Sequence, residues 1–254
     1  MPVLRELRPG VVKVVGTAFW ITRYGLLMTA GHVADDLVQQ GQLCLAFVPQ
    51  FQGQDEVILR RLLNISRMNE VDIAVLQAEN FGSSAPRPIA NKRAPLSAEV
   101  PAVGSPMSCY GYPLNEILTL SEGTLSTIRG DFYEGQMLGT GAQGEHPFLP
   151  YPHIVTSIDL KSGASGAPAF DEAGRVVGIC SRGWELLDGP PLSYVVPVSL
   201  ALRMQVHGAQ IPESSWEFSQ LPHSRRKKDW LWMFELVQYG HVEFVPAPTL
   251  PEER

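Results

Sequence analysis

One serine, Ser165, stands among small residues in the stretch Gly163-Ala164-Ser165-Gly166-Ala167-Pro168. A serine nucleophile needs an open approach to a carbonyl carbon and backbone N–H groups that face the oxyanion formed there. Small neighbours allow both, and a glycine at 163 can turn its own N–H toward the same point as that of Ser165. We therefore expect Ser165 to be a nucleophile, with Gly163 and Ser165 forming an oxyanion hole. Taken alone, the stretch is equally consistent with a glycine-rich turn between two strands.

A serine hydroxyl requires a base within hydrogen-bond reach and a third group that orients this base. Of the six histidines, His32 alone follows an apolar, strand-like run, residues 26–29, with two small residues in between. The other five lie among prolines, glycines and polar residues, and no pair has the spacing of metal ligands. Asp72 stands at the head of the apolar run 73–76, where an unpaired carboxylate would be costly to bury. We predict His32 as the base and Asp72 as its orienting acid, with no metal and no cofactor.

A fold rich in short strands must position these residues. The 23 glycines and 21 prolines are spread along the chain, which favours many turns between strands. Short β-branched or apolar runs recur between them, at residues 11–15, 17–22, 26–29, 43–48, 57–63, 72–76, 107–110, 123–128, 153–158, 176–180 and 194–197. The runs 17–22 and 26–29 have the pattern of a hairpin. The whole pattern predicts an all-β sandwich or barrels.

The chain of 254 residues is long enough for one large domain or two small ones. A stretch rich in proline, serine and alanine indicates a connector between two compact halves. We place the first domain at residues 1–84, the linker at 85–105, the second domain at 106–205 and a C-terminal extension at 206–254. The extension contains a candidate helix that is apolar on nearly every face, from Trp230 to Val237. Such a helix must be covered, either by this protein or by a partner chain.

Composition excludes several classes of function. A net charge of -6 argues against a nucleic-acid partner, and the basic cluster at residues 225–228 is short. The sequence has no apolar run long enough to cross a membrane and no signal-peptide pattern at its start, so we expect no membrane partner and a cytoplasmic location. Cys44, Cys109 and Cys180 each lie in strand-like apolar sequence, which is typical of buried thiols and not of a disulfide framework.

Taken together, these segments resemble the trypsin-like serine proteases of the chymotrypsin fold, in particular the intracellular and bacterial branch that includes the high-temperature-requirement proteases. The matching segments, in the family's order of His, Asp and Ser, are GTAFWI from residue 16, LMTAGHV from residue 27, DIAVL from residue 72, SGASGAP from residue 162 and VGICS from residue 177. The resemblance covers roughly residues 9–200. It implies two antiparallel six-stranded β-barrels with the site between them, and a serine endopeptidase that cleaves a protein or peptide substrate through an acyl-enzyme. His32 and Asp72 would come from the first barrel and Ser165 from the second.

Two departures from the family bear on regulation. Secreted members have a cysteine directly after the histidine, where this chain has Val33, in keeping with a version without disulfides. They also have an aspartate directly before the serine, which binds a new N-terminus after zymogen cleavage, whereas this chain has Ala164. Other contacts must therefore hold or switch the oxyanion loop. We expect a regulatory protein partner that acts through the C-terminal extension.

The resemblance also suggests a specificity pocket. Asp159, six residues before the serine, would lie at its base and select arginine or lysine, and Ser181 and Gly183 would flank it. Two neighbouring cations leave an alternative open, because either Arg182 or Lys161 could neutralise Asp159 and turn it into half of an internal ion pair.

Two other classes of function compete with the protease interpretation. An α/β-hydrolase has the nucleophile pattern G-x-S-x-G, which Ala167 breaks, and its acid and histidine follow the serine. A catalytically silent trypsin-like module, used for binding or as a scaffold, would keep the same fold. Replacing Ser165 by alanine distinguishes the enzyme from the scaffold, since an enzyme loses turnover while a scaffold keeps its biological role.

Overall fold

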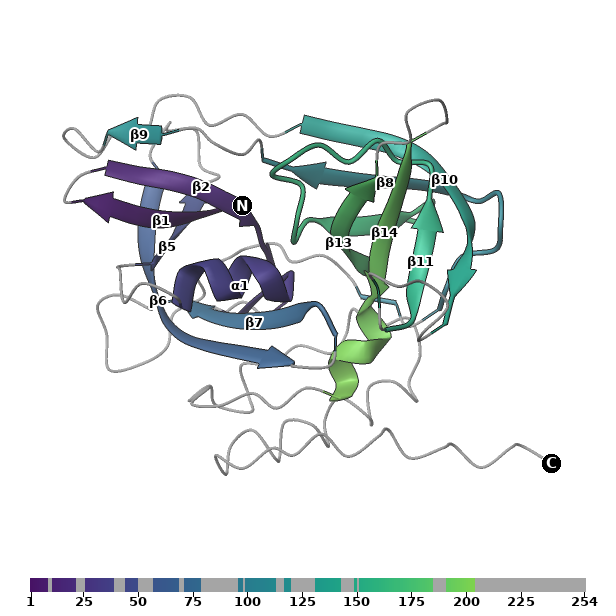
Figure 1. The fold of residues 1–254 in the computed structure, drawn as a ribbon, viewed down its shortest axis with the longest axis horizontal. Coiled ribbons are helices and arrows are strands. Elements are labelled where there is room, and N and C mark those ends of the chain that lie inside the picture. The colour runs from purple at the N-terminus through teal and green to yellow at the C-terminus, as the bar shows by residue number, and fades with distance from the viewer. Residues whose placement is uncertain are drawn as a thin grey trace.

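The computed structural model describes residues 1–8, 11–21, 26–38, 44–49, 57–68, 71–78, 96–97, 99–112, 117–119, 131–142, 149, 151–184 and 191–203. These residues are mostly in β-strands (Figure 1). The strands before the linker are β1 (Pro2–Arg8), β2 (Val11–Thr17), β3 (Phe19–Trp20), β4 (Leu26–Thr29), β5 (Cys44–Pro49), β6 (Val57–Met68) and β7 (Ile73–Ala78), with helix α1 (Gly31–Val38) after β4. The elements after it are β8 (Pro106–Gly111), β9 (Ile117–Thr119), β10 (Asp131–Gly141), β11 (His153–Thr156), β12 (Pro168–Asp171), β13 (Val176–Trp184), β14 (Leu192–Pro197) and the 3₁₀ helix η1 (Val198–Arg203).

The first half of the chain forms an eight-stranded sheet in the order β3-β4-β7-β6-β5-β1-β2-β9. Ala18 alone separates β2 from β3 in the chain, so the two ends of the seven-stranded run from β3 to β2 are covalently joined there. The sheet must curl for these ends to meet. β9 comes from the second half of the chain and extends the sheet beyond β2 by antiparallel pairing, for example Val12 with Leu118. The six-stranded barrel expected in this half stays a prediction.

The second half forms a closed barrel of six strands in the order β10-β11-β14-β13-β12-β8, which confirms the expected barrel there. Two of its strands, β8 and β10, follow the two-residue period of a half-buried sheet. In β8, Met107, Cys109 and Gly111 are buried, while Pro106 and Tyr110 are exposed. In Figure 1 this barrel lies beside the first sheet, with α1 between β1 and β7 in the view and η1 below β14.

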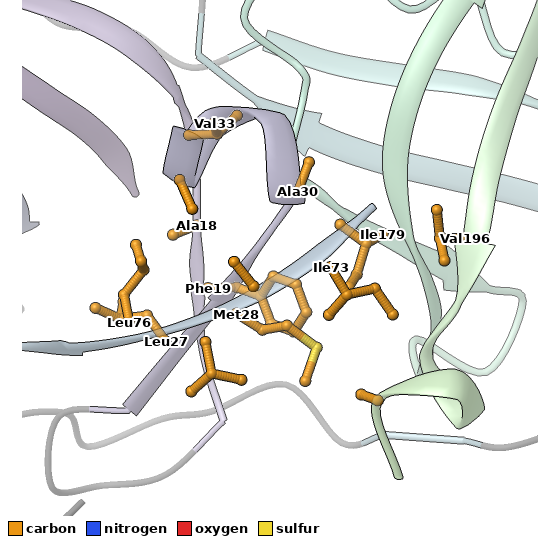
Figure 2. Close-up of a cluster of buried hydrophobic side chains, with 14 of the residues drawn as sticks. Ala18, Phe19, Leu27, Met28, Ala30, Val33, Ile73, Leu76, Ile179 and Val196 are labelled. Atoms are coloured by element: carbon orange, nitrogen blue, oxygen red, sulfur yellow. The ribbon is translucent and has the colours of Figure 1, made fainter. Parts of the chain in front are cut away.

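A shared hydrophobic core joins the two halves. Met28 and Ile73 of the first sheet belong to the same buried cluster as Ile179 and Val196 of the barrel. Figure 2 shows these side chains grouped between the two halves. The buried apolar area therefore stabilises the docking of the halves as well as each half by itself.

Several expectations about the elements can be compared with the structure. The predicted hairpin is confirmed, because β3 and β4 pair antiparallel with Phe19 opposite Met28. Strands β1, β9, β10 and β12 and helix α1 were not expected. Within the predicted linker, Leu96 forms a parallel bridge to Val176, so this segment packs on the barrel. The predicted domain boundaries stay predictions, and the predicted strand at 123–128 and the extension at 206–254 lie outside the described residues.

The cysteine prediction is confirmed for two residues. Cys109 and Cys180 are free thiols with no exposed surface, on β8 and β13 of the barrel. The side chain of Cys44 lies outside the description. None of the helices in the described ranges is both long and apolar enough to span a bilayer.

Candidate active site

His32 and Asp72 lie on neighbouring elements of the first half. His32 is in the first turn of α1, directly after β4, and Asp72 directly precedes β7. β4 and β7 are paired, with Thr29 opposite Ala74, so the end of one strand lies next to the start of the other. The His32 side chain is 37% exposed and that of Asp72 is 8% exposed. The imidazole therefore reaches solvent while the carboxylate beneath it is buried.

Asp72 binds His32 through both of its carboxylate oxygens. Oδ1 accepts the backbone N–H of His32 at 2.7 Å, and Oδ2 lies 2.8 Å from Nδ1 of the ring. Burial by itself raises the pKa of Asp72, but the hydrogen bonds and charge of His32 and the hydrogen bond from Ser181 lower the pKa to about 2. Asp72 is therefore ionised at neutral pH. Its contact with Nδ1 favours the proton on that nitrogen and leaves Nε2 to act as a base.

A chain of hydroxyl groups continues from Asp72 into the barrel. Ser181 Oγ donates to Asp72 Oδ2 at 2.5 Å, and Tyr151 OH lies 3.2 Å from Ser181 Oγ. Since Ser181 gives its single proton to the carboxylate, Tyr151 must be the donor in the second bond. Both side chains are buried, and burial raises the pKa of Tyr151. Side chains of the second half thus support Asp72, which belongs to the first half.

Ser165 lies in the turn between β11 and β12, in the segment 161–167, which we call the nucleophile loop. Gly163 and Gly166 adopt φ angles of 106° and 85°, in the left-handed region that favours glycine. The N–H groups of Gly163 and Ser165 have no acceptor among the residues that the structure describes. Both groups are therefore available as hydrogen-bond donors, and the oxyanion hole at Gly163 and Ser165 stays a prediction.

The hydroxyl of Ser165 donates to the backbone carbonyl of Ser181 at 3.2 Å. Within the described ranges it forms no hydrogen bond with His32. Ser181 nevertheless connects the two, since its backbone accepts from Ser165 and its side chain donates to the acid that binds His32. In enzymes without substrate the bond between nucleophile and base is often long or poorly aligned.

The three residues predicted for substrate binding have different surroundings. Asp159 forms an ion pair with Lys161, Oδ2 to Nζ at 2.6 Å, and its side chain is 49% exposed. Gly183 lies against the chain next to Asp159, because a Cβ at Gly183 would come within 2.8 Å of the carbonyl oxygen of Leu160. Ser181 is only 2% exposed and its hydroxyl faces Asp72. Gly183 thus lies next to the segment that contains Asp159. The Ser181 side chain, in contrast, contacts Asp72.

Comparison with known proteins identifies the family. The sequence profile of the trypsin-like peptidase domain matches residues 16–179, which include His32, Asp72 and Ser165. The chain belongs to the trypsin-like peptidase family. The prediction of a trypsin-like serine protease, a hydrolase, is confirmed at the level of the family. No curated protein matches the sequence.

Solved structures of proteases share the trypsin-like fold with this chain. The crystal structure of Deg5 is 19% identical, with a TM-score of 0.55 over 80% of this chain and 86% of Deg5. The HtrA-type protease AlgW, solved with a decapeptide, is 18% identical, with a TM-score of 0.52 over 76% of this chain. This chain covers 50% of AlgW. The active form of the Rv3671c protease from M. tuberculosis is 21% identical, with a TM-score of 0.50 over 78% of this chain and 76% of that one.

Two side chains that support the candidate site were not predicted from the sequence. Tyr151 binds Ser181, and Thr17 binds the nucleophile loop. The signal for Thr17 is a hydroxyl between Gly16 and Ala18, at the end of an apolar strand. Tyr151 gives no such signal, because its partner Ser181 is 30 residues away in the chain. In the described ranges, no group of three or more His, Cys, Asp or Glu side chains is arranged to hold a metal ion.

Proposed function

We propose that this protein is a serine endopeptidase in which His32, Asp72 and Ser165 form the catalytic triad. The single observation that carries the proposal is the pair of hydrogen bonds by which Asp72 holds His32, at 2.7 and 2.8 Å, in a domain of the trypsin-like peptidase family. These two bonds hold the imidazole in one orientation and leave its other ring nitrogen available as a base.

The reaction follows from these positions. His32 Nε2 takes the proton of Ser165 as Oγ attacks the substrate carbonyl carbon, and the N–H groups of Gly163 and Ser165 bind the resulting oxyanion. The tetrahedral intermediate collapses to an acyl-enzyme as His32 gives its proton to the leaving amine. Water then attacks the acyl carbon as His32 takes its proton, and His32 returns this proton to Ser165 Oγ as the bond from Oγ to the acyl carbon breaks and the acid product leaves. Asp72 stabilises the imidazolium in both halves of the reaction.

The bond from Ser165 to the carbonyl of Ser181 supports a resting state that must rearrange before the reaction. A rotation of the Ser165 side chain would move its hydroxyl from that carbonyl toward His32. This fits regulation by a protein partner through the C-terminal extension, with the binding of partner or substrate favouring the reactive rotamer.

As part of the same proposal, we expect only a weak specificity for arginine or lysine before the cleaved bond. A carboxylate selects a cation strongly when it is buried and unpaired, because a neutral substrate then leaves its charge unsatisfied. Asp159 is half exposed and paired with Lys161. Exposed pairs of this kind contribute about 1 kcal/mol or less, so a basic substrate side chain has to compete with Lys161 for a small gain. We expect a modest preference for arginine and lysine.

A fluorophosphonate, which forms a covalent adduct with an activated serine, tests the proposal directly. The wild-type chain should be labelled at Ser165, and Ser165→Ala should not be labelled. Ser162→Ala is the matched control, because it removes an exposed hydroxyl of the same loop. Hydrolysis of a fluorescent unfolded protein should fall by about 10⁴-fold or more in Ser165→Ala, His32→Ala and Asp72→Asn. Absence of labelling and turnover in the wild-type chain, including in extract of its native cell, would favour the catalytically silent scaffold.

A further inference from the structure

The nucleophile loop of this chain has no carboxylate to anchor it, because Ala164 stands directly before Ser165. Ala164 is buried, and its N–H donates to the carbonyl of Lys161 at 3.0 Å. A loop that presents two unpaired N–H groups must be held in place by its other backbone groups. The contacts of these other groups identify what holds it.

Two peptide units of the loop are bonded at both of their polar atoms. In the unit between Gly163 and Ala164, the carbonyl accepts from Thr17 Oγ1 at 2.7 Å and the N–H donates to Lys161. In the unit between Ser165 and Gly166, the carbonyl accepts from the backbone N–H of Thr17 at 2.8 Å and the N–H donates to the carbonyl of Cys180 at 2.7 Å. The two peptide units that alternate with these carry the free N–H groups of Gly163 and Ser165.

Thr17 is itself fixed within the first half. It is fully buried, its carbonyl accepts from Thr29 Oγ1 at 2.6 Å, and its Oγ1 also accepts the backbone N–H of Tyr112 at 3.0 Å. One threonine hydroxyl thus satisfies a donor and an acceptor of the second half at once, which uses its single proton and one of its lone pairs. Valine has the same shape and can do neither.

We propose that Thr17 is a positioning residue for the oxyanion hole. Its hydroxyl and N–H bind the carbonyls of Gly163 and Ser165 and thereby orient the two N–H groups that bind the oxyanion. The inference rests on the proposed serine protease function. One buried hydroxyl of the first half thus holds the loop, which has no carboxylate at position 164.

The test compares Thr17→Val, which removes the hydroxyl at constant shape, with Thr17→Ser, which restores it. Ser97→Ala is the control for stability, because Ser97 is a buried hydroxyl that accepts the N–H of Glu99 and does not contact the loop. The measured quantities are the second-order rate of Ser165 labelling by a fluorophosphonate and the kcat and KM for a fluorescent unfolded protein. All are measured on the full chain, below the melting temperature of each variant.

We expect Thr17→Val to lower the labelling rate and kcat by about 10- to 100-fold, with KM nearly unchanged, because a displaced oxyanion hole weakens transition-state binding more than substrate binding. Thr17→Ser should recover most of the rate, and Ser97→Ala should lose stability alone. The inference is overturned if Thr17→Val labels at the wild-type rate, if Thr17→Ser is as slow as Thr17→Val, or if the whole loss is in KM.

Amide hydrogen exchange separates this inference from the proposed function. The amides of Ala164 and Gly166, which belong to the loop and are bonded to Lys161 and Cys180, should exchange faster in Thr17→Val, while the Asp171 amide, bonded to Arg175 outside the loop, should not change. A wild-type chain without labelling or turnover would overturn the proposed function, and the exchange rates would still decide whether Thr17 holds the loop. Unchanged exchange of the Ala164 and Gly166 amides in Thr17→Val would overturn the inference even in an active enzyme.

Discussion

Asp72 stays ionised although it is buried, because every oxygen of its carboxylate has a hydrogen-bond donor. The pKa of about 2 lies below the ordinary value of 3.8, so the folded protein stabilises the charged form of this carboxyl group. This contributes stability above about pH 4, which is lost as the pH falls toward 2 and the carboxyl is protonated. The contribution is about 2 kcal/mol. The acid that orients His32 is therefore also a source of stability.

The first prediction concerns the hydrogen bond from Ser181 to Asp72. In Ser181→Ala, loss of this bond to the charged form should raise the pKa of Asp72 toward its ordinary value. The decrease in unfolding free energy between about pH 4 and pH 2 should then be smaller than in the wild type, by about 1 kcal/mol. Urea denaturation at a series of pH values measures this decrease.

Ser193→Ala is the control for this measurement, because Ser193 is equally buried and its hydroxyl faces Leu160. It should lower the unfolding free energy by a similar amount at every pH. If Ser181→Ala shows the same acid dependence as the wild type, the carboxylate does not depend on Ser181 for its ionisation.

The second prediction concerns the partner of Asp159. Replacement of Lys161 by alanine removes the cation that lies 2.6 Å from the carboxylate. The freed carboxylate should bind substrate cations better, so cleavage after arginine and lysine should increase relative to cleavage after small or aliphatic residues, by roughly 3- to 5-fold. A peptide library profiled with both proteins measures the ratio. An unchanged profile in Lys161→Ala and in Asp159→Ala would remove Asp159 from substrate recognition.

The site residues that the sequence predicts are those that stand out from the residues next to them in the chain. Ser165, His32 and Asp72 each stand out because an apolar or glycine-rich run surrounds one reactive side chain. Thr17, Tyr151 and the role of Ser181 depend on partners far along the chain, for instance 109 residues between Ser181 and Asp72. The bonds of Thr17 to the loop and of Ser181 to Asp72 follow from the docking of the two halves, and the bond of Tyr151 to Ser181 follows from the folding of the barrel; no local pattern specifies either.

At the scale of elements, the nucleophile loop passes so close to the first sheet that one position must be glycine. A Cβ on Gly166 would overlap the Thr17 carbonyl oxygen and Thr29 Oγ1, and its φ of 85° is unfavourable for other residues. Both partners come from the first half. The loop is therefore fitted to the opposite sheet as well as to its own barrel.

The third prediction follows from this fit. Gly166→Ala should lower the unfolding free energy by about 3 kcal/mol or more, through steric overlap and backbone strain together. Gly174→Ala is the matched control, since its φ is 71° but nothing lies within 4 Å of the added Cβ. It should cost only the strain, about 1 kcal/mol. Equal losses for the two variants in urea denaturation would mean that the close contact at Gly166 is relieved without cost.

Elements with a clear period were predicted, and those without one were not. The hairpin of β3 and β4 has continuous apolar strands on both sides of a turn. Strand β10 alternates in burial from Tyr133 to Gly141, but three of its less exposed positions are glycines, so its sequence lacks the apolar alternation of a half-buried strand. Two of these glycines are required by close contacts, Gly135 with the backbone of Ile158 and Gly141 with the ring of His153. Helix α1 has only 8 residues, too few for a helical period to be distinct.

At the scale of the whole molecule, the candidate site depends on both halves being docked. Asp72 and His32 belong to the first half, and their support, Ser181 and Tyr151, belongs to the second. The core that contains Met28 and Ile179 holds the halves together. The sequence predicts two halves and a shared site. Strand β9, which extends the first sheet, could not be predicted because it has only 3 residues.

The last prediction concerns regulation by the C-terminal extension, residues 206–254. The Ser165 hydroxyl donates to the Ser181 carbonyl, so it must leave that acceptor before His32 can take its proton, and a bound partner that favours the reactive orientation would raise the rate in proportion to its population. The purified full chain should therefore label slowly with a fluorophosphonate, and extract of its native cell should accelerate the labelling of Ser165. A chain that ends at residue 205 should label at the slow basal rate and show no acceleration, because the apolar helix expected at 230–237 is the surface a partner would cover. Rapid labelling of the purified full chain, equal to that of the truncated chain with and without extract, would show that the extension has no part in regulation.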